Sequence, residues 1–213
     1  MYENKNWICR EWGFDVTIPN CLDQDIKRLN LMKEYSNYLY PNIYVSYNKK
    51  GVKICQKRIL HRSLEDVKGN KTAYKIVEKL TKVISLNIVH GDLCASNIGF
   101  DKHGELLIFD WEPFLKIHKP NSNLIELRSS KYALHPKDQT SKCITSRSDL
   151  FATGSLLLQA LYGRYRGLNL MKQNTNLISK FSENTGNPTL GIQKMFKFAK
   201  ELKYSRQIND NYK

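Results

Sequence analysis

Apolar residues recur along the chain at spacings that predict several helices. Over residues 23–39, 72–86 and 190–204, apolar side chains return every three or four positions, which is typical of helices with one buried face. Residues 150–162 are apolar on nearly every side, which predicts a helix that is buried all round. Gly163 follows directly and is expected to end this helix, because glycine readily takes the conformations that close helix carboxyl ends.

Short β-rich runs lie between these helices. Residues 42–47 and 52–59 are separated by a polar turn with a glycine, which predicts a hairpin. A second hairpin is expected from residues 98–100 and 106–109, because the segment between them is also polar and contains glycine. An earlier strand is expected at residues 6–12. All of the expected strands lie before residue 110 and only helices are expected after it, which predicts an α+β fold.

The length of 213 residues fits one domain or a small two-lobed unit, and 41% hydrophobic residues are enough to form a sizeable core. No apolar stretch approaches the roughly 20 residues that span a bilayer. The first residues lack the apolar segment of a secretory signal, so a cytoplasmic location is expected. Signal-independent delivery into another cell stays open as an alternative.

Five cysteines are scattered along the chain, and none forms a CxxC pair. An odd number at wide spacing favours neither a zinc site nor a disulfide framework. Reduced thiols are therefore expected at all five positions, in keeping with a cytoplasmic location. These positions are Cys9, Cys21, Cys55, Cys94 and Cys143.

The formal net charge is +14, with 34 Lys and Arg against 20 Asp and Glu. A basic surface suits anionic partners such as a nucleotide, a nucleic acid, an acidic protein or an anionic lipid. Because no Arg-aromatic motif accompanies the charge, a Lys-rich solvated surface is the simpler interpretation and a nucleic-acid partner is not expected. For residues 190–204, a packed surface helix is expected, and a helix lying on a membrane surface is the alternative.

Candidate chemistry concentrates in residues 90–112, which read HGDLCASNIGFDKHGELLIFDWE. Asp92 is followed five residues later by Asn97, and Asp110 comes after the apolar run of the second expected hairpin. That hairpin brings Asn97 and Asp110 side by side. Phosphoryl transfer from a nucleotide needs one carboxylate that receives or orients the acceptor hydroxyl proton, and two oxygen ligands for Mg²⁺.

Together, the His90-Gly91-Asp92 triplet, Asn97 and Asp110 resemble the catalytic core of the protein-kinase-like superfamily. That superfamily includes eukaryotic-type protein kinases and the aminoglycoside and choline phosphotransferases. The resemblance implies that Asp92 orients the acceptor hydroxyl and that Asn97 and Asp110 bind Mg²⁺. It implies a structural role for His90, packed beneath the catalytic loop.

Residues 148–154, SDLFATG, resemble the Ser-Asp-Val-Trp-Ser-x-Gly opening of the large central helix of protein kinases. The resemblance implies that Asp149 accepts hydrogen bonds from backbone N–H groups of the catalytic loop. A plain helix N-cap at Ser148 or Asp149 is the alternative. Residues 113–147 are polar and irregular, and a connection of that length is more often a functional loop than a linker. Within it, 130–136 sits where a kinase activation segment ends.

Three departures from the protein-kinase pattern bear on function. Gly91 replaces the arginine of His-Arg-Asp, so control by phosphorylation of an activation loop is not expected by the usual route. Asp110-Trp111-Glu112 replaces Asp-Phe-Gly and is closer to the small-molecule phosphotransferases. Cys94 stands where protein Ser/Thr kinases carry a lysine.

The nucleotide-binding half is less clear from the sequence. No G-x-G-x-x-G occurs before residue 40, so the glycine loop that covers the phosphates is absent there. A cation for the phosphates is expected at Lys5 or Arg10, with Asp25 or Glu34 as its acidic mate; ordinary surface charge is the alternative for each. By the resemblance, the hinge that holds adenine would consist of Lys57, Arg58, Ile59 and Leu60.

The expected architecture is a two-lobed protein-kinase-like α+β fold, with a reduced N-terminal lobe at 1–60 and a small helical C-terminal catalytic lobe at 61–213. The expected function is ATP- and Mg²⁺-dependent transfer of the γ-phosphoryl group to a Ser/Thr or Tyr hydroxyl of a protein substrate. One alternative is a small-molecule phosphotransferase acting on a sugar, a lipid headgroup or an aminoglycoside-like hydroxyl. Another is a pseudokinase that serves as a binding module.

Overall fold

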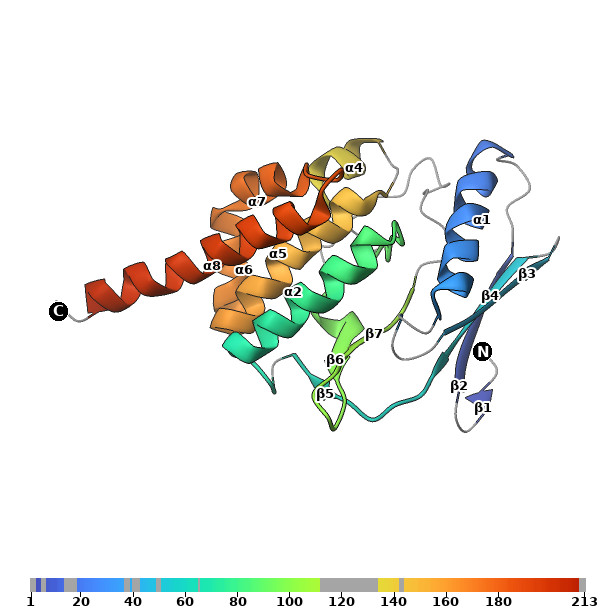
Figure 1. Ribbon diagram of the computed structural model, residues 1–213, viewed down its shortest axis with the longest axis horizontal. Helices are drawn as coiled ribbons and strands as arrows, with labels where there is room; N and C mark the ends of the chain where they lie inside the picture. Colours follow the sequence, from blue (N-terminus) through green and yellow to red (C-terminus); the bar gives the residue numbers. More distant parts are fainter. Residues whose placement is uncertain are drawn as a thin grey trace.

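A four-stranded antiparallel sheet forms one end of the molecule (Figure 1). Its strands are β1 (Glu3–Asn4), β2 (Trp7–Gly13), β3 (Ile43–Asn48) and β4 (Gly51–Lys57), in the order β1-β2-β4-β3. Helix α1 (Pro19–Glu34) packs beside the sheet and contacts β3. The computed structural model describes residues 3–4, 7–13, 19–36, 39, 43–48, 51–64, 66–111, 134–141 and 144–210.

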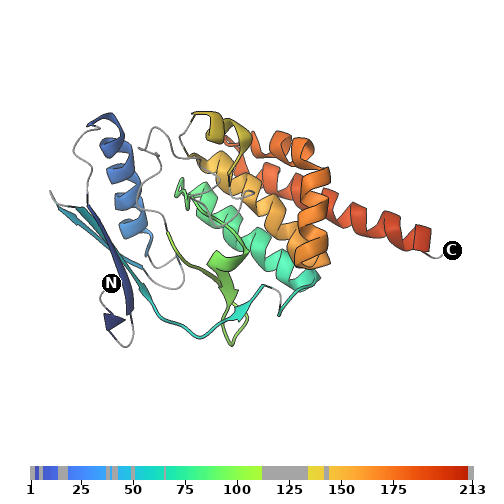
Figure 2. The same ribbon diagram turned by 180° about the vertical axis from the view of Figure 1, so that it is seen from behind.

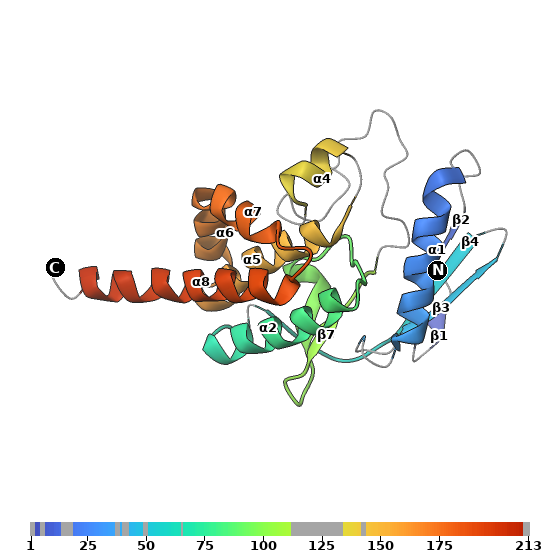
Figure 3. The same ribbon diagram turned by 45° about the horizontal axis from the view of Figure 1, so that its top comes forward.

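The other end of the molecule is helical. Helix α5 (Ser146–Tyr162) packs against four neighbours and is buried along most of its length, as its apolar sequence predicts. Its C-cap is Gly163, with φ 80°, a conformation that glycine takes without steric cost. The last helix extends beyond its neighbours in all three views, with the carboxyl terminus at its far end (Figures 1, 2 and 3). The four neighbours are α2 (Asn70–Ser85), α6 (Arg164–Gln173), α7 (Thr175–Ser182) and α8 (Pro188–Asp210).

Between these two ends lies a small three-stranded sheet (Figures 1 and 2). It consists of β5 (Arg62–Ser63) and the hairpin of β6 (Ile98–Phe100) and β7 (Leu106–Ile108). All six hairpin strand residues are buried. The expected hairpin is therefore confirmed, and its open end carries Asn97 and Phe109 side by side.

The helix and strand predictions are confirmed with small shifts in their ends. The helix expected at 23–39 is α1 and ends at Glu34, while the helix expected at 190–204 begins at Pro188 and runs on to Asp210. Part of the segment expected to be irregular, 113–147, is helical in α4 (Pro136–Ser141), and residues 112–133 lie outside the described residues. Among the described helices, none is long and apolar enough to span a membrane.

The prediction of reduced thiols throughout is wrong for two cysteines. Cys9 and Cys55 form a disulfide, because the antiparallel register of β2 and β4 sets them directly opposite each other with their Cα atoms 4.0 Å apart. Two strands 46 residues apart in sequence create this pair, so no local spacing could reveal it. Cys94 is buried outside any disulfide, and its Sγ lies 3.0 Å from the Ser96 hydroxyl.

Candidate active site

Asp149 holds the backbone of the candidate catalytic loop. Its carboxylate is buried and accepts the N–H of His90 at 2.6 Å and the N–H of Gly91 at 3.1 Å. Helix α5 begins one turn earlier, with Thr145 as the N-cap that accepts a hydrogen bond from the backbone N–H of Arg147. The alternative of a plain N-cap at Ser148 or Asp149 is therefore wrong, because both residues lie inside the helix.

Burial and hydrogen bonding shift the pKa of this carboxyl group in opposite directions. Burial raises the pKa of Asp149 from its ordinary value of 3.8 to about 6, although the two loop N–H groups and the positive charge of Arg28 favour the ionised form. At neutral pH the group is ionised and can accept both bonds. Protonation near pH 6 weakens the attachment of the loop.

Arg28 connects α1 to the same loop. It is only 4% exposed, and its Nη1 donates to the main-chain oxygen of Val89 at 2.5 Å. Sequence reasoning missed this residue. A signal was present, since Arg28 lies four residues before Met32 and therefore on the apolar face of the helix, where a charged side chain needs a polar partner.

Asp92 and Asn97 form a second fixed unit. The Asn97 amide Nδ2 donates to the main-chain oxygen of Asp92 at 2.8 Å and to its carboxylate at 3.3 Å. Both residues are buried. The one-turn helix η2 (Ala95–Asn97) ends the loop that joins Asp92 to Asn97, and β6 follows it directly.

His90 bridges the loop and the strand that leads to Asp110. Its Nε2 lies 2.6 Å from the main-chain oxygen of Phe109, and its Nδ1 lies 3.2 Å from the backbone nitrogen of Asp92. A carbonyl can only accept and a backbone N–H can only donate, so the neutral ring carries its proton on Nε2. The ring also packs on Trp111, with centroids 4.7 Å apart. This arrangement matches the structural role expected of His90.

Asp110 lies at the open end of the hairpin with φ 54°, in the left-handed region. Phe109 donates its N–H to the main-chain oxygen of Asn97 at 2.7 Å, which keeps the two expected Mg²⁺ ligands on adjacent strand ends. Arg10 from β2 pairs with both oxygens of the Asp110 carboxylate, at 3.0 and 3.1 Å. This ion pair is partly exposed, at 43% for Arg10 and 44% for Asp110.

Asn97 and Asp110 supply oxygen donors, which suit a hard cation such as Mg²⁺. Within the described residues, no group of three His, Cys, Asp or Glu side chains could hold a metal by itself. Mg²⁺ in nucleotide sites is usually held by one or two side chains, with waters and phosphate oxygens completing its shell. The donor set therefore fits a metal that arrives with a phosphate ligand.

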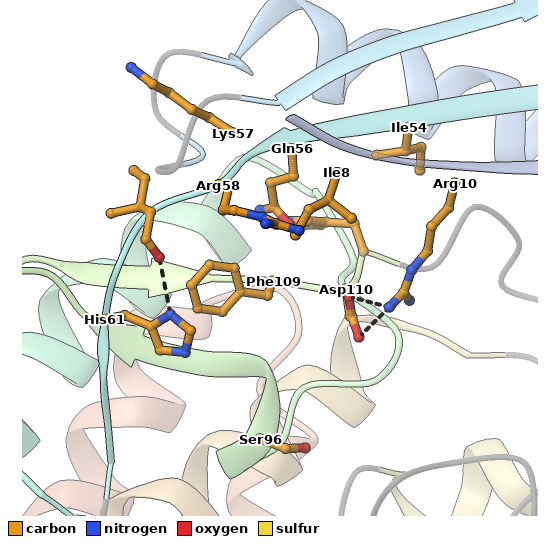
Figure 4. Close-up of a pocket in the computed structure, with 12 residues that line it drawn as sticks. Ile8, Arg10, Ile54, Gln56, Lys57, Arg58, His61, Ser96, Phe109 and Asp110 are labelled. Carbon is orange, nitrogen blue, oxygen red and sulfur yellow. Dashed lines mark hydrogen bonds and ion pairs between the residues drawn. The ribbon is translucent and has the colours of Figure 1, made fainter. Parts of the chain in front are cut away.

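A cavity of about 280 Å³ opens beside Asp110, between the large sheet and the end of the hairpin (Figure 4). Its walls combine apolar side chains with charges, as small-molecule sites usually do. In Figure 4 the Lys57 side chain extends away from the Arg10–Asp110 pair. The lining residues are Ile8, Arg10, Ile54, Gln56, Lys57, Arg58, Ile59, His61, Ser96, Phe109, Asp110 and Trp111.

The expected nucleotide-binding residues divide into three groups. Arg10 and the hinge residues Lys57, Arg58 and Ile59 line the cavity. Leu60 does not line it and is 94% exposed. Lys5 and the side chain of Asp25 lie outside the described residues, and Glu34 is exposed.

A third network anchors α4 to α5. The buried carboxylate of Asp138 accepts hydrogen bonds from the Thr145 backbone and from the Ser148 hydroxyl, at 2.8 and 2.7 Å. Ser148 in turn accepts the backbone N–H of His135 at 3.0 Å. Burial lowers the pKa of His135, which keeps this ring neutral. The end of the long connection is thus fixed to the helix that carries Asp149.

Comparison of the sequence with protein-family models and with curated proteins finds no match.

Proposed function

We propose that the protein is an ATP- and Mg²⁺-dependent phosphotransferase with a two-lobed protein-kinase-like arrangement, and that its acceptor is a protein hydroxyl. One observation carries this proposal. The buried Asp149 carboxylate holds the backbone of residues 90 and 91 at the start of the loop that carries Asp92 and Asn97, and Ser96 of that loop lines the cavity beside Asp110. A structural helix cap needs no such attachment to a distant loop.

In the proposed reaction the acceptor oxygen bonds to the γ-phosphorus while the bond to the β,γ-bridging oxygen breaks and ADP leaves. Asp92 orients the acceptor hydroxyl and receives its proton. Asn97 and Asp110 provide the metal-binding oxygens, and bound Mg²⁺ neutralises charge on the transferred group. The catalytic contribution of these residues is positioning and electrostatic stabilisation, with no covalent enzyme intermediate.

Arg10 is the candidate cation for the nucleotide phosphates. It lines the cavity from β2 and pairs with Asp110. Exposed ion pairs are worth only about 0–1 kcal/mol. A phosphate oxygen can therefore take the place of the Asp110 carboxylate on Arg10, which frees that carboxylate for Mg²⁺.

A protein acceptor is favoured by the attachment of α4 to α5. This attachment fixes the end of the long connection at 134–136, a position from which the connection can present a peptide. A small-molecule acceptor is the second candidate, and Trp111 supports it. The Asp-Trp-Glu sequence is typical of those enzymes, and the indole packs on His90.

One experiment separates these functions. The purified chain is incubated with γ-labelled ATP and Mg²⁺, with either a cell lysate or a metabolite pool, beside Asp92→Asn and Asp110→Gly. Label on protein that is lost in both variants supports the proposal. Label only on small molecules selects the second candidate. Nucleotide binding without transfer to any acceptor identifies a pseudokinase.

A further inference from the structure

A second cavity, of about 450 Å³, lies at the opposite end of the β6–β7 hairpin from Asp110. One wall is the segment from Asp66 to Thr72, which leads into α2. The other wall comes from Arg62 and from the hairpin turn at Lys102, His103 and Gly104. Among the described residues, it shares no lining residue with the cavity beside Asp110. It is therefore a separate feature of the surface.

The charges around this cavity are almost all positive. Among its described lining residues, five carry cationic side chains and one carries an acid: Arg62, Lys68, Lys71, Lys75 and Lys102 against Asp66. The Asp66 carboxylate is turned back onto its own loop, where it accepts hydrogen bonds from the backbone N–H and the hydroxyl of Ser63, at 3.0 and 2.7 Å. It is therefore engaged by its own loop, and besides these hydrogen bonds the charge of nearby Arg62 also helps to lower its pKa.

The cations divide into one structural residue and several available ones. Lys75 is partly buried and donates to the main-chain oxygen of Gly104 and to Glu105, so it fastens the hairpin turn to α2. Lys68, Lys71 and Lys102 are exposed, and none forms an ion pair with a residue in the described part of the chain. The first turn of α2 adds no acid and contributes the positive end of its dipole.

Like charges gathered around a hollow repel one another and focus a positive potential into it. Anionic groups are the ligands that such a site attracts. The volume exceeds what one small anion needs, since a water molecule in the liquid occupies about 30 Å³. The site therefore has room for several anionic side chains.

We propose that this cavity docks an acidic peptide segment, rich in Asp, Glu or phosphorylated residues, that belongs to the protein acceptor. The proposal rests on the proposed protein-directed transfer. A single-stranded nucleic acid is disfavoured because Phe100 is the only Phe, Tyr or Trp among the described lining residues and is buried, so no exposed ring of that kind is available to stack on bases.

The position of the cavity sets how such an acceptor is arranged. Three-residue strands of about 3.3 Å per residue place the hairpin turn roughly 10 Å from the open end that carries Asn97. The acidic segment therefore lies apart in sequence from the hydroxyl that receives the phosphoryl group. Docking there raises acceptor affinity without touching the reacting atoms.

The test measures binding directly and needs no phosphoryl transfer. A fluorescein-labelled hexaglutamate peptide is titrated with the full chain and followed by fluorescence anisotropy. The parent is compared with the triple variant Lys68→Ala/Lys71→Ala/Lys102→Ala. Its matched control is Lys172→Ala/Lys180→Ala/Lys194→Ala, which removes the same charge from exposed positions on α6, α7 and α8. Circular dichroism verifies that both variants are folded.

We expect at least a tenfold weaker affinity in the cavity variant and less than a twofold change in the control. Equal losses in the two variants would mean that only net charge matters, and would overturn the proposal. So would peptide affinity no greater than that of inorganic phosphate measured by competition. A ten-nucleotide RNA that binds the parent more tightly than the peptide, and loses affinity in the cavity variant, would also overturn it.

The same titration with Asp92→Asn separates this proposal from the proposed function. Peptide binding is expected to be unchanged in that variant, because Asp92 does not line the cavity. Transfer activity with no peptide binding refutes the docking site alone. Peptide binding with no transfer to any acceptor refutes the proposed function and leaves an acidic-peptide site.

Discussion

The two sides of the candidate active site are built in different ways. On the acceptor side, Asp92, Asn97 and Asp149 are buried and are held by hydrogen bonds to the backbone or to each other. On the side proposed for the nucleotide, Arg10 and Asp110 are partly exposed and pair with each other at the mouth of a cavity. Under the proposed function, this difference predicts that the acceptor side is rigid before any ligand binds and that the nucleotide side rearranges when one does.

The largest effect is expected at Asp92 on the rigid side. Replacement by asparagine keeps the shape of the side chain but removes the carboxylate that is proposed to receive the proton. Transfer should fall by about 10²–10⁴-fold, the usual contribution of a positioned general base. The rate of label transfer from ATP under single-turnover conditions measures it. A variant as active as the parent would refute the assignment of Asp92, and unchanged nucleotide affinity serves as the control.

The next effect concerns the stability of the rigid side. Asp149→Ala leaves two buried N–H groups without acceptors, each at a cost of about 1–3 kcal/mol, partly offset because a buried charge is also removed. The free energy of unfolding should fall by about 3 kcal/mol in urea denaturation. Asp149→Asn keeps one acceptor oxygen and should lose less. Equal stability of the alanine variant and the parent would show that the loop is held by other contacts.

The third prediction concerns pH and the link from α1 to the rigid side. The rate of transfer should decline as pH falls through about 6, because protonation of Asp149 weakens the hydrogen bonds that it accepts from the loop. Arg28→Met removes the charge that favours the ionised carboxyl, so the acid side of the pH–rate profile should move to higher pH. A profile that does not move would contradict the coupling.

Protonation of Asp149 is expected to change stability and activity in opposite directions. Because the folded-state pKa of Asp149 lies above its ordinary value of 3.8, the folded state binds more protons than the unfolded state between these pH values. The contribution of this group to the free energy of unfolding therefore falls as pH rises from about 4 to about 6. Acid loss of transfer should thus precede any unfolding caused by Asp149, which denaturation at pH 5 and pH 7 can measure.

The smallest effect on stability is expected on the nucleotide side, at the ion pair of Arg10 and Asp110. Arg10→Ala should change the free energy of unfolding by no more than about 1 kcal/mol, since the ion pair that it removes is partly exposed. Its affinity for Mg·ATP should nevertheless fall by about tenfold, the equivalent of one lost charge-assisted hydrogen bond. Isothermal titration measures that affinity. Lys53→Ala, which removes an ion pair with Glu11 in the same two strands, is the matched control.

Sequence reasoning succeeded where the determining contacts are local or follow a repeated pattern. The β6–β7 hairpin and the buried α5 follow from apolar spacing and turn residues. The attachment of Asp149 to the loop was expected from the Ser-Asp-x-x-x-x-Gly resemblance. Failures came where distant segments meet. The Cys9–Cys55 pair depends on strand register, and the burial of Arg28 depends on how α1 packs against the loop.

The backbone at Asp110 restricts which substitutions evolution or mutagenesis can place there. With φ 54°, the position accepts glycine, asparagine and aspartate readily, whereas other side chains are strained. Binding of Mg²⁺ sets a different requirement, a side-chain oxygen, which glycine lacks and glutamate has. Only aspartate and asparagine meet both the backbone requirement and the requirement for a side-chain oxygen. In a saturation library at residue 110, glycine should therefore be enriched when folding alone is selected and lost when transfer is selected.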